Sequence, residues 1–355
     1  MNDLCLDCET TTFNKGNPFD SRNQLVCIAL CGGGQSWCLA PTNENLAFCQ
    51  TQIDNATRLV GFNLKFDLHW LRRVGLNFSE KRVYDVQAAE FVLSGQTHKF
   101  PSLNDVGQKY LGRTKIDEVK AFWDQGVQTT DIPWEILERY AIEDVDLTLS
   151  VARKQEADTP NSLKRLISLV NQDLLVLEEM EWNGIKFDRE KSLKKAEELE
   201  TKISELQRKH DIHTNVPNFN WGSNHHLSAL LYGGTIDETI KVPVGHFKSG
   251  KQKGEIKFKN ETRQHHLPRI YQPPKGSETA TPGVFGVGEE ILSQLKGKNK
   301  ELLTDLLEMK KLQKENSTYL LGFPKRQDEG HYKDYIYGNF NQCVAATGRL
   351  SSTAP

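Results

Sequence analysis

The chain has 355 residues, 37% of them hydrophobic, and its 45 Lys and Arg nearly balance its 47 Asp and Glu. These values exclude a disordered or fibrous protein and suit a globular chain of two or three domains. No apolar run reaches the ~18 residues that span a bilayer. The acidic start MNDLCLDCE lacks the basic segment of a secretory signal, so we expect a cytoplasmic protein without a membrane partner.

The first half of the chain is typical of an α/β domain. Residues 1–12 predict a strand, and residues 24–39 predict a hairpin that turns at Gly32-Gly33-Gly34. Further patterns predict a strand at 57–63 and helices at 43–53, 64–76, 83–95, 101–112 and 133–157. Strands followed by helices indicate a mixed sheet covered by helices, and we place this domain at residues 1–158.

The second half is mainly helical. Residues 161–210 have helical periodicity, interrupted at WNGIKFD, and a helix is expected after Ser223. Residues 241–283 are rich in Gly, Pro and Lys, and HFKSGKQKGEIKFK predicts a β-hairpin with a basic tip. Helical patterns return at 288–297 and 300–323.

Charge is distributed unevenly along the chain. Residues 1–150 hold 14 Lys and Arg against 20 Asp and Glu, whereas residues 241–275 hold 9 against 2. The acidic first 150 residues are consistent with a metal-dependent catalyst, and the basic segment is consistent with a surface that binds a polyanion. The simpler interpretation of the basic segment is a solvated run of charge.

Six of the seven cysteines lie in the first fifty residues. Cys5-x-x-Cys8 looks like half of a zinc site. A strand would aim these two sulfurs at opposite faces, however, so we expect the cysteines to be small packing residues.

Four carboxylates and a tyrosine are candidates for a metal site. Asp7 and Glu9 are two residues apart in the first strand and share one face, where like charges need compensation. Tyr140 and Asp144 share one face of a helix, and Asp67 follows a strand-to-helix turn. Carboxylate oxygens suit Mg²⁺ or Mn²⁺, and two such ions can assist phosphodiester cleavage, with Tyr140 placed to orient the attacking water. Each carboxylate taken alone is more simply a solvated or capping group.

Three segments, LDCET, GFNLKFD and YAIED, resemble the motifs of the DEDD 3′→5′ exonucleases of the tyrosine subclass. The resemblance implies a ribonuclease-H-like fold and two divalent metal ions. It implies that Asp7 bridges both ions, that Glu9 and Asp144 hold the tighter one, and that Asp67 acts on the second, directly or through water.

The same resemblance implies contacts to DNA. Thr10 and Phe13 match positions that bind the 3′-terminal nucleotide, and Asn63 and Phe66 match positions along the path of the single strand. Helix capping by Thr10 and core packing by Phe66 are the simpler alternatives. Asp85 also resembles a family position, but we assign it no metal.

Four later segments resemble family A, polymerase-I-like DNA polymerases of the phage type: LEEMEWNGIKFD, FNWGSNHHLSALLYGG, KKLQKENSTYLLGFP and GNFNQCVAATGRLSSTAP. The resemblance implies a linker helix at 159–188, a thumb at 189–330 with a basic insertion at 241–283, and the start of a palm at 331–355. It implies duplex contacts by Lys251 and Lys253 and a minor-groove contact by Arg349, for which a surface salt bridge is the alternative.

The implied protein is the proofreading exonuclease and DNA-gripping part of a replicative polymerase, bound to a single-stranded 3′ end and to a primer–template duplex. Polymerisation would need a palm and fingers beyond residue 355, supplied by a separately encoded chain, by splicing, or by the rest of a longer protein. Two alternatives stay open: a stand-alone DEDD exonuclease, against which TGRLSS argues, and a non-catalytic DNA-binding subunit of a split polymerase.

Overall fold

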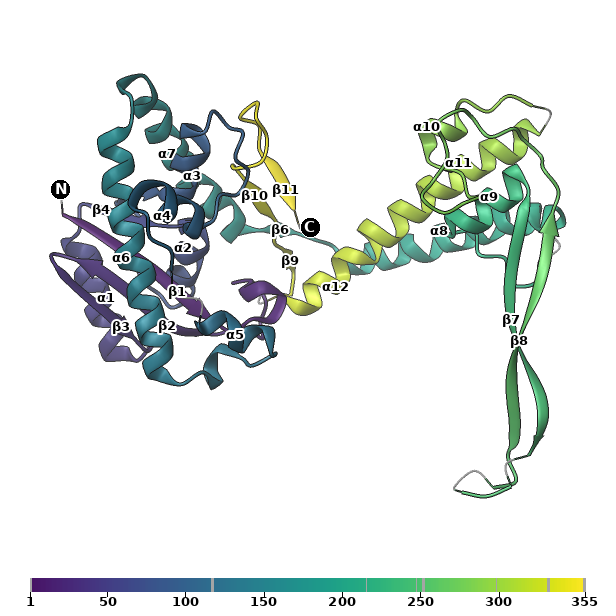
Figure 1. The fold of residues 1–355 in the computed structure, drawn as a ribbon, viewed down its shortest axis with the longest axis horizontal. Coiled ribbons are helices and arrows are strands. Elements are labelled where there is room, and N and C mark those ends of the chain that lie inside the picture. Colours follow the sequence, from purple (N-terminus) through teal and green to yellow (C-terminus); the bar gives the residue numbers. More distant parts are fainter. Residues whose placement is uncertain are drawn as a thin grey trace. The chain divides into compact units, whose positions relative to one another are not determined.

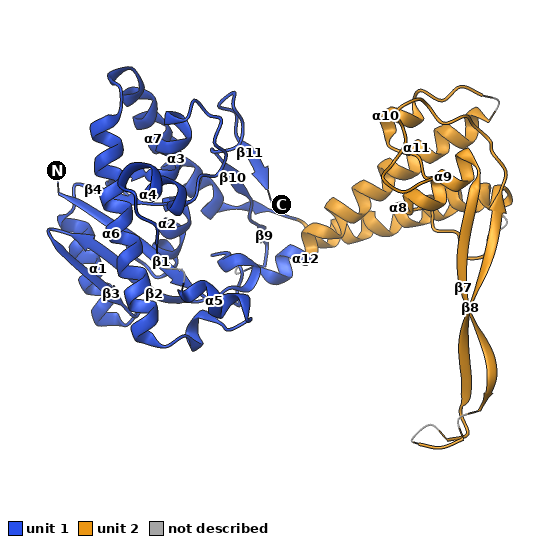
Figure 2. Ribbon diagram, in the orientation of Figure 1, with its two compact units in different colours: residues 1–187, 325–355 blue, residues 188–324 orange. Residues whose placement is uncertain are grey.

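The computed structural model describes residues 2–115, 118–214, 216–246, 248–250, 253–297, 299–330 and 333–353 (Figure 1). The chain forms two compact units, one of residues 1–187 with 325–355 and one of residues 188–324 (Figure 2). The domain boundary expected at 158/159 lies within the first unit, between two long helices.

The first unit is built on a five-stranded sheet of order β3-β2-β1-β4-β5. Its strands are β1 Asp3–Thr10, β2 Leu25–Gly32, β3 Gln35–Leu39, β4 Arg58–Gly61 and β5 Arg82–Asp85. β1, β2 and β3 pair antiparallel, whereas β1, β4 and β5 pair parallel. The mixed sheet expected from the sequence is therefore confirmed.

One expected helix was partly wrong. Residues 83–95 begin as strand β5, which pairs with β4, and the helix α3 starts only at Val86. Val83 and Tyr84 favour a strand, and the Asp85 carboxylate accepts hydrogen bonds from the backbone N–H groups of Gln87 and Ala88, which fixes the start of the helix.

Helices cover both faces of the sheet: α1 Asn43–Asn55, α2 Leu64–Arg73, α3 Val86–Leu93, α4 Leu103–Leu111, α5 Glu118–Asp124, α6 Trp134–Asp158 and α7 Asn161–Asn183. Alternation along β1 sends Cys5 to the α6 face and Leu4, Leu6 and Cys8 to the α1–α2 face. The Cys5 and Cys8 thiols thus lie on opposite faces, and all seven cysteines are buried without a disulfide. α5 was not expected from the sequence.

The C-terminal segment completes the first unit. β6 Ile185–Lys186 pairs with β9 Tyr335–Ile336, and β10 Asn339–Asn341 pairs with β11 Ser351–Thr353. Glu181 of α7, 3% exposed, accepts hydrogen bonds from the Lys65 ammonium of α2 and from the backbone N–H of Phe340. The Glu181 carboxylate therefore links α7 to α2 and to β10 by hydrogen bonds.

The second unit is mainly helical: α8 Arg189–His210, α9 Asn224–Tyr232, α10 Glu289–Leu292, α11 Lys300–Lys314 and α12 Gly322–Glu329, whose last residues belong to the first unit. The hairpin of β7 Gly234–His246 and β8 Ile256–Leu267 includes the first part of the basic segment, and it is longer than the hairpin that the sequence predicts. A π-helical turn, Glu315–Leu320, interrupts the helix expected at 300–323. Among the described residues, no helix combines the length and the hydrophobicity needed to cross a bilayer.

Candidate active site

Asp7, Glu9 and Asp144 come together between β1 and α6. The alternation that turns Cys5 toward α6 also turns Asp7 and Glu9 to that face. α6 buries Leu137, Tyr140, Ala141 and Asp144 on one stripe, so Asp144 points at the sheet. One carboxylate oxygen from each of Asp7, Glu9 and Asp144 lies within 4.8 Å of the other two. We call these three residues the carboxylate cluster.

The cluster is electrostatically unfavourable without a cation. Burial raises the pKa of Asp7 to about 7, and the neighbouring Asp144 carboxylate adds to the rise. Burial and then the Asp7 charge raise the pKa of Glu9 well above its usual value. Burial and like charges both disfavour the ionised carboxylates, and a bound cation would relieve this repulsion. The donors are all carboxylate oxygens, the ligand type that hard divalent ions prefer, so these residues fit Mg²⁺ or Mn²⁺.

Lys115 is a residue of this site that sequence analysis missed. Its ammonium lies 2.9 Å from Asp144 Oδ2, donates a hydrogen bond to the Tyr140 hydroxyl, and lies 4.5 Å from the centre of the Tyr140 ring. The backbone N–H of Lys115 donates to Asn104 Oδ1 at 2.8 Å, which anchors the loop. Lys115 follows α4 in a loop without periodicity, so no sequence pattern points to it.

Tyr140 lies one helical turn before Asp144, as expected. It is 4% exposed, and the Trp123 ring meets it edge-on at 6.0 Å. Burial, followed by the Asp144 charge, raises the Tyr140 pKa, so the phenol keeps its proton at neutral pH. The ring is fixed by packing, and its hydroxyl is held by Lys115 beside the carboxylates.

Asp67 lies beside the cluster but is not one of its three members. It comes from the first turn of α2 and is 2% exposed, and its Oδ1 accepts a hydrogen bond from the backbone N–H of Cys8 at 2.9 Å. Burial, followed by the Asp7 charge, raises the pKa of Asp67 well above its usual value. Asp67 therefore holds β1 between the two cluster residues Asp7 and Glu9.

Asp85 has a different role from the other acids. Its carboxylate accepts from the backbone N–H groups of Asn63, Leu64, Gln87 and Ala88, which lie at the starts of α2 and α3. It therefore caps two helices.

Three of the expected DNA-contacting residues gather near the end of β1. A Cβ on Gly16 would lie 2.6 Å from Thr10 Oγ1 and 3.3 Å from Phe66 Cζ, so these residues are packed around the Gly16 backbone. Thr10 is buried, and Phe66 is partly buried against the α1–α2 face. Phe13 is 39% exposed on the same turn, with the Arg22 guanidinium 5.5 Å from its ring centre.

The other expected contacts lie elsewhere. Asn63 is the exposed N-cap of α2, with a positive φ of 57°. Arg349 is exposed in the segment between β10 and β11, and Lys253 is exposed in the turn between β7 and β8. Lys251 lies outside the described residues. The structure thus brings together Asp7, Glu9 and Asp144, and it brings together Thr10 and Phe66 around Gly16.

Comparisons with known proteins match both halves of the chain. A family model described as 3′-5′ exonuclease matches residues 1–157, and a model of DNA polymerase family A matches residues 235–355. DNA polymerase I of Pseudomonas aeruginosa is 26% identical over 303 residues, which are 83% of this chain and 29% of that protein. DNA polymerase DpoZ of Salmonella phage PMBT28 is 26% identical over 228 residues, 58% of this chain and 35% of that protein.

A solved structure shows the same fold. The POL domain of Pol1 from M. smegmatis, in complex with DNA primer-template and dNTP, has a TM-score of 0.67 and 18% sequence identity over 99% of this chain and 51% of that chain. The chain spans about a third of the length of the two curated relatives named above. With its front matching the exonuclease model and its later part the polymerase model, the chain belongs to the family A DNA polymerases and carries their 3′-5′ exonuclease domain.

Proposed function

We propose that the first unit removes nucleotides from the 3′ end of DNA by metal-assisted hydrolysis. The observation that carries this proposal is the convergence of Asp7, Glu9 and Asp144, from β1 and α6, inside the segment that matches the exonuclease model. In the reaction water attacks the last phosphodiester, the bond from phosphorus to the 3′ oxygen breaks, and that oxygen takes up a proton. The products are a nucleoside 5′-monophosphate and a DNA strand with a new 3′ hydroxyl.

The carboxylate cluster would hold two divalent ions, with Asp67 assisting, and these ions would activate water and neutralise charge on the phosphate. Tyr140 keeps its proton and accepts a hydrogen bond from the Lys115 ammonium, and we expect its hydroxyl to orient the attacking water. Asp67 fixes the end of β1 through the backbone of Cys8. Phe13 offers an exposed ring on which the terminal base can stack, beside Thr10 and Phe66.

Removal of two cluster carboxylates tests this proposal. Asp7→Asn with Glu9→Gln should lower the cleavage of a 5′-labelled single-stranded oligonucleotide by at least about 10³-fold, because the ions lose two of their ligands. DNA binding should remain measurable by fluorescence anisotropy. Glu44→Gln, which removes an exposed carboxylate on α1, is the matched control and should retain full activity. A double variant that cleaves within about tenfold of the parent would contradict the site.

We also propose that the β7–β8 hairpin contacts duplex DNA. The polymerase model covers the hairpin, and Lys253, Lys257 and Lys259 are exposed near its tip. Phosphate contacts of this kind hold DNA without regard to sequence and are weakened by salt. In the complete polymerase, Arg349 would approach the minor groove near the primer end.

Charge reversal separates duplex binding from general electrostatics. Changing Lys253, Lys257 and Lys259 to Glu should weaken binding of a primer–template duplex and reduce the slope of log Kd against log salt by about 2–3. The matched control changes three exposed α8 lysines, Lys191, Lys194 and Lys195, to Glu. If both triple variants lose the same amount of duplex affinity, the hairpin lysines are only a solvated run of charge and the proposed contact is wrong.

Polymerisation and an action in DNA replication in the cytoplasm stay predictions. They are supported by the polymerase match at residues 235–355 and by polymerase relatives that include phage proteins. The same match favours a polymerase over a stand-alone exonuclease.

A further inference from the structure

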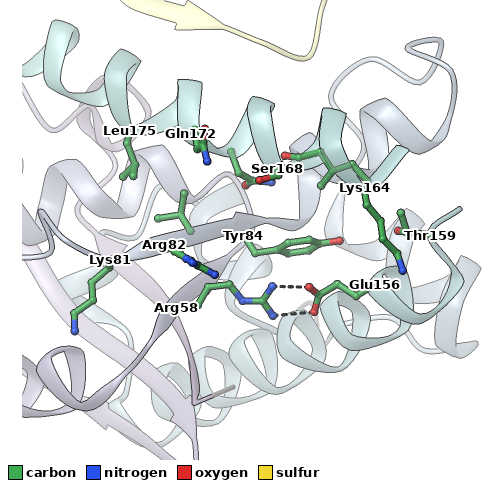
Figure 3. Close-up of a pocket in the computed structure, with 13 residues that line it drawn as sticks. Arg58, Lys81, Arg82, Tyr84, Glu156, Thr159, Lys164, Ser168, Gln172 and Leu175 are labelled. Atoms are coloured by element: carbon green, nitrogen blue, oxygen red, sulfur yellow. Dashed lines mark hydrogen bonds and ion pairs between the residues drawn. The ribbon is translucent and has the colours of Figure 1, made fainter. Parts of the chain in front are cut away.

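The first half of α7 is anchored to the sheet. Arg82 of β5 and Lys164 of α7 line a cavity of about 630 Å³ between β5, α6 and α7 (Figure 3). Beside this cavity the backbone N–H of Asp85, at the end of β5, donates a hydrogen bond to Asn171 Oδ1 of α7 at 2.6 Å. Asn171 is buried, so this bond fixes α7 to the sheet and makes the acids of its second half fixed partners for other elements.

The second half of α7 presents two buried acids to α2. Glu181 Oε1 accepts a hydrogen bond from the Lys65 ammonium, and Glu181 Oε2 lies 2.8 Å from His69 Nε2. Three residues earlier on α7, the Glu178 carboxylate accepts two hydrogen bonds from the Arg72 guanidinium, at 2.9 and 2.6 Å. Lys65, His69 and Arg72 are spaced i, i+4, i+7 and so share one side of α2. That side is held along its length by α7.

Strand β10 supplies the other two acceptors of Lys65. The Lys65 ammonium donates to the Phe340 carbonyl and, at 3.1 Å, to Asn339 Oδ1. An ammonium has three N–H groups, and Glu181, Asn339 and Phe340 accept from all three. The Lys65 side chain is 11% exposed, so water has little access to replace these acceptors. This lysine of α2 is therefore fully hydrogen-bonded only when β10 is in place.

Asp67 lies on the opposite side of α2. At about 100° per residue, it is about 200° around the helix from Lys65. On that side Asp67 Oδ1 accepts a hydrogen bond from the backbone N–H of Cys8, between Asp7 and Glu9, at 2.9 Å. The contacts of Lys65 on one side of α2 thus set the rotation of the helix that carries Asp67 on the other side.

We propose that Lys65 is a positioning residue for the exonuclease reaction. Held by Glu181 of α7 and by β10, it fixes the rotation of α2 and keeps Asp67 in place against β1. The inference rests on the proposed function, because it concerns the second metal ion, on which Asp67 is expected to act. It also means that β10, which lies in the segment matched by the polymerase model, contributes to the exonuclease site.

Mn²⁺ binding to the full chain, followed by electron paramagnetic resonance of the free ion, tests the role of Lys65 separately from cleavage. Residues that orient metal ligands typically change metal affinity by about 10–100-fold when they are lost. Lys65→Met should therefore raise the Kd of the weaker Mn²⁺ by about tenfold. Electrostatics alone predicts the opposite sign, because removal of a positive charge favours the binding of a divalent cation. Unchanged or tighter Mn²⁺ binding in Lys65→Met would overturn the proposal.

Arg72→Met is the matched control. It removes the ion pair of Arg72 with Glu178, which also joins α2 to α7 but lies at the end of α2 away from Asp67. This variant should be less stable in urea and should bind Mn²⁺ as the parent does. A rise in the Mn²⁺ Kd equal to that of Lys65→Met would mean that any loosening of α2 has this effect, and the specific role of Lys65 would be wrong.

Asn339→Ala tests the contribution of β10 with little risk to the fold, because Asn339 is exposed. The variant removes one acceptor of the Lys65 ammonium and should raise the Kd of the weaker Mn²⁺ by about two- to fivefold, the effect of one hydrogen bond. An unchanged Kd would exclude β10 from the exonuclease site. If the parent binds Mn²⁺ no better than the Asp7→Asn, Glu9→Gln variant, the proposed function itself is wrong, and the role of Lys65 with it.

Discussion

Lys115→Met would test whether the carboxylate cluster is built around positive charge. The Lys115 side chain is 23% exposed and that of Asp144 is 8% exposed, so their ion pair is largely buried. Loss of one partner of a buried pair costs about 3–5 kcal/mol, whereas exposed pairs contribute about 0–1 kcal/mol. For this intermediate pair we expect the variant to lose about 2 kcal/mol of unfolding free energy in EDTA.

Divalent ions should reduce that loss. A bound ion compensates Asp7, Glu9 and Asp144 directly, so the deficit of Lys115→Met should become smaller in millimolar Mg²⁺ than in EDTA. Urea denaturation followed by circular dichroism in the two buffers measures both values. Lys120→Met removes an exposed lysine near the same loop and serves as the control. An equal deficit with and without Mg²⁺ would refute the electrostatic account of the cluster.

Three further variants test the surrounding packing, each by urea denaturation. Asp85→Ala should cost about 2–3 kcal/mol, because four N–H groups at two helix starts lose their acceptor; a loss under about 0.5 kcal/mol would exclude the capping role. Gly16→Ala should cost about 1–3 kcal/mol, because Gly16 has φ of +71° and its Cβ would meet Thr10; parental stability would show that the turn can relax. Glu181→Gln should cost about 3 kcal/mol because the Lys65 ammonium loses its carboxylate partner, and a neutral effect would mean that α7 does not depend on this pair.

The sequence predicts those parts of the fold that depend on periodicity. The alternation of β1 places Asp7 and Glu9 on one face, and the helical repeat of α6 places Tyr140 and Asp144 on one stripe. These two local rules suffice to anticipate that the carboxylates face each other once α6 covers the sheet. The roles of these residues in catalysis stay predictions, which the double variant of Asp7 and Glu9 tests.

Features set by tertiary contacts were not accessible from the sequence. Lys115 reaches Asp144 because the loop after α4 is anchored at Asn104, and neither residue has a periodic signal. The helix predicted at 83–95 overlaps β5 because four residues are too few to show alternation, and pairing with β4 decides their conformation. Likewise, Arg82 and Lys164 line one cavity although they are 82 residues apart in the chain.

The most direct test of the central claim is a crystal of the full chain soaked in Mn²⁺, with anomalous diffraction recorded at the manganese edge. The account predicts an anomalous peak at roughly 2.0–2.4 Å from carboxylate oxygens of Asp7, Glu9 and Asp144, the range for hard divalent ions. The absence of a peak at this cluster, at a Mn²⁺ concentration that supports full DNA cleavage in solution, would contradict it.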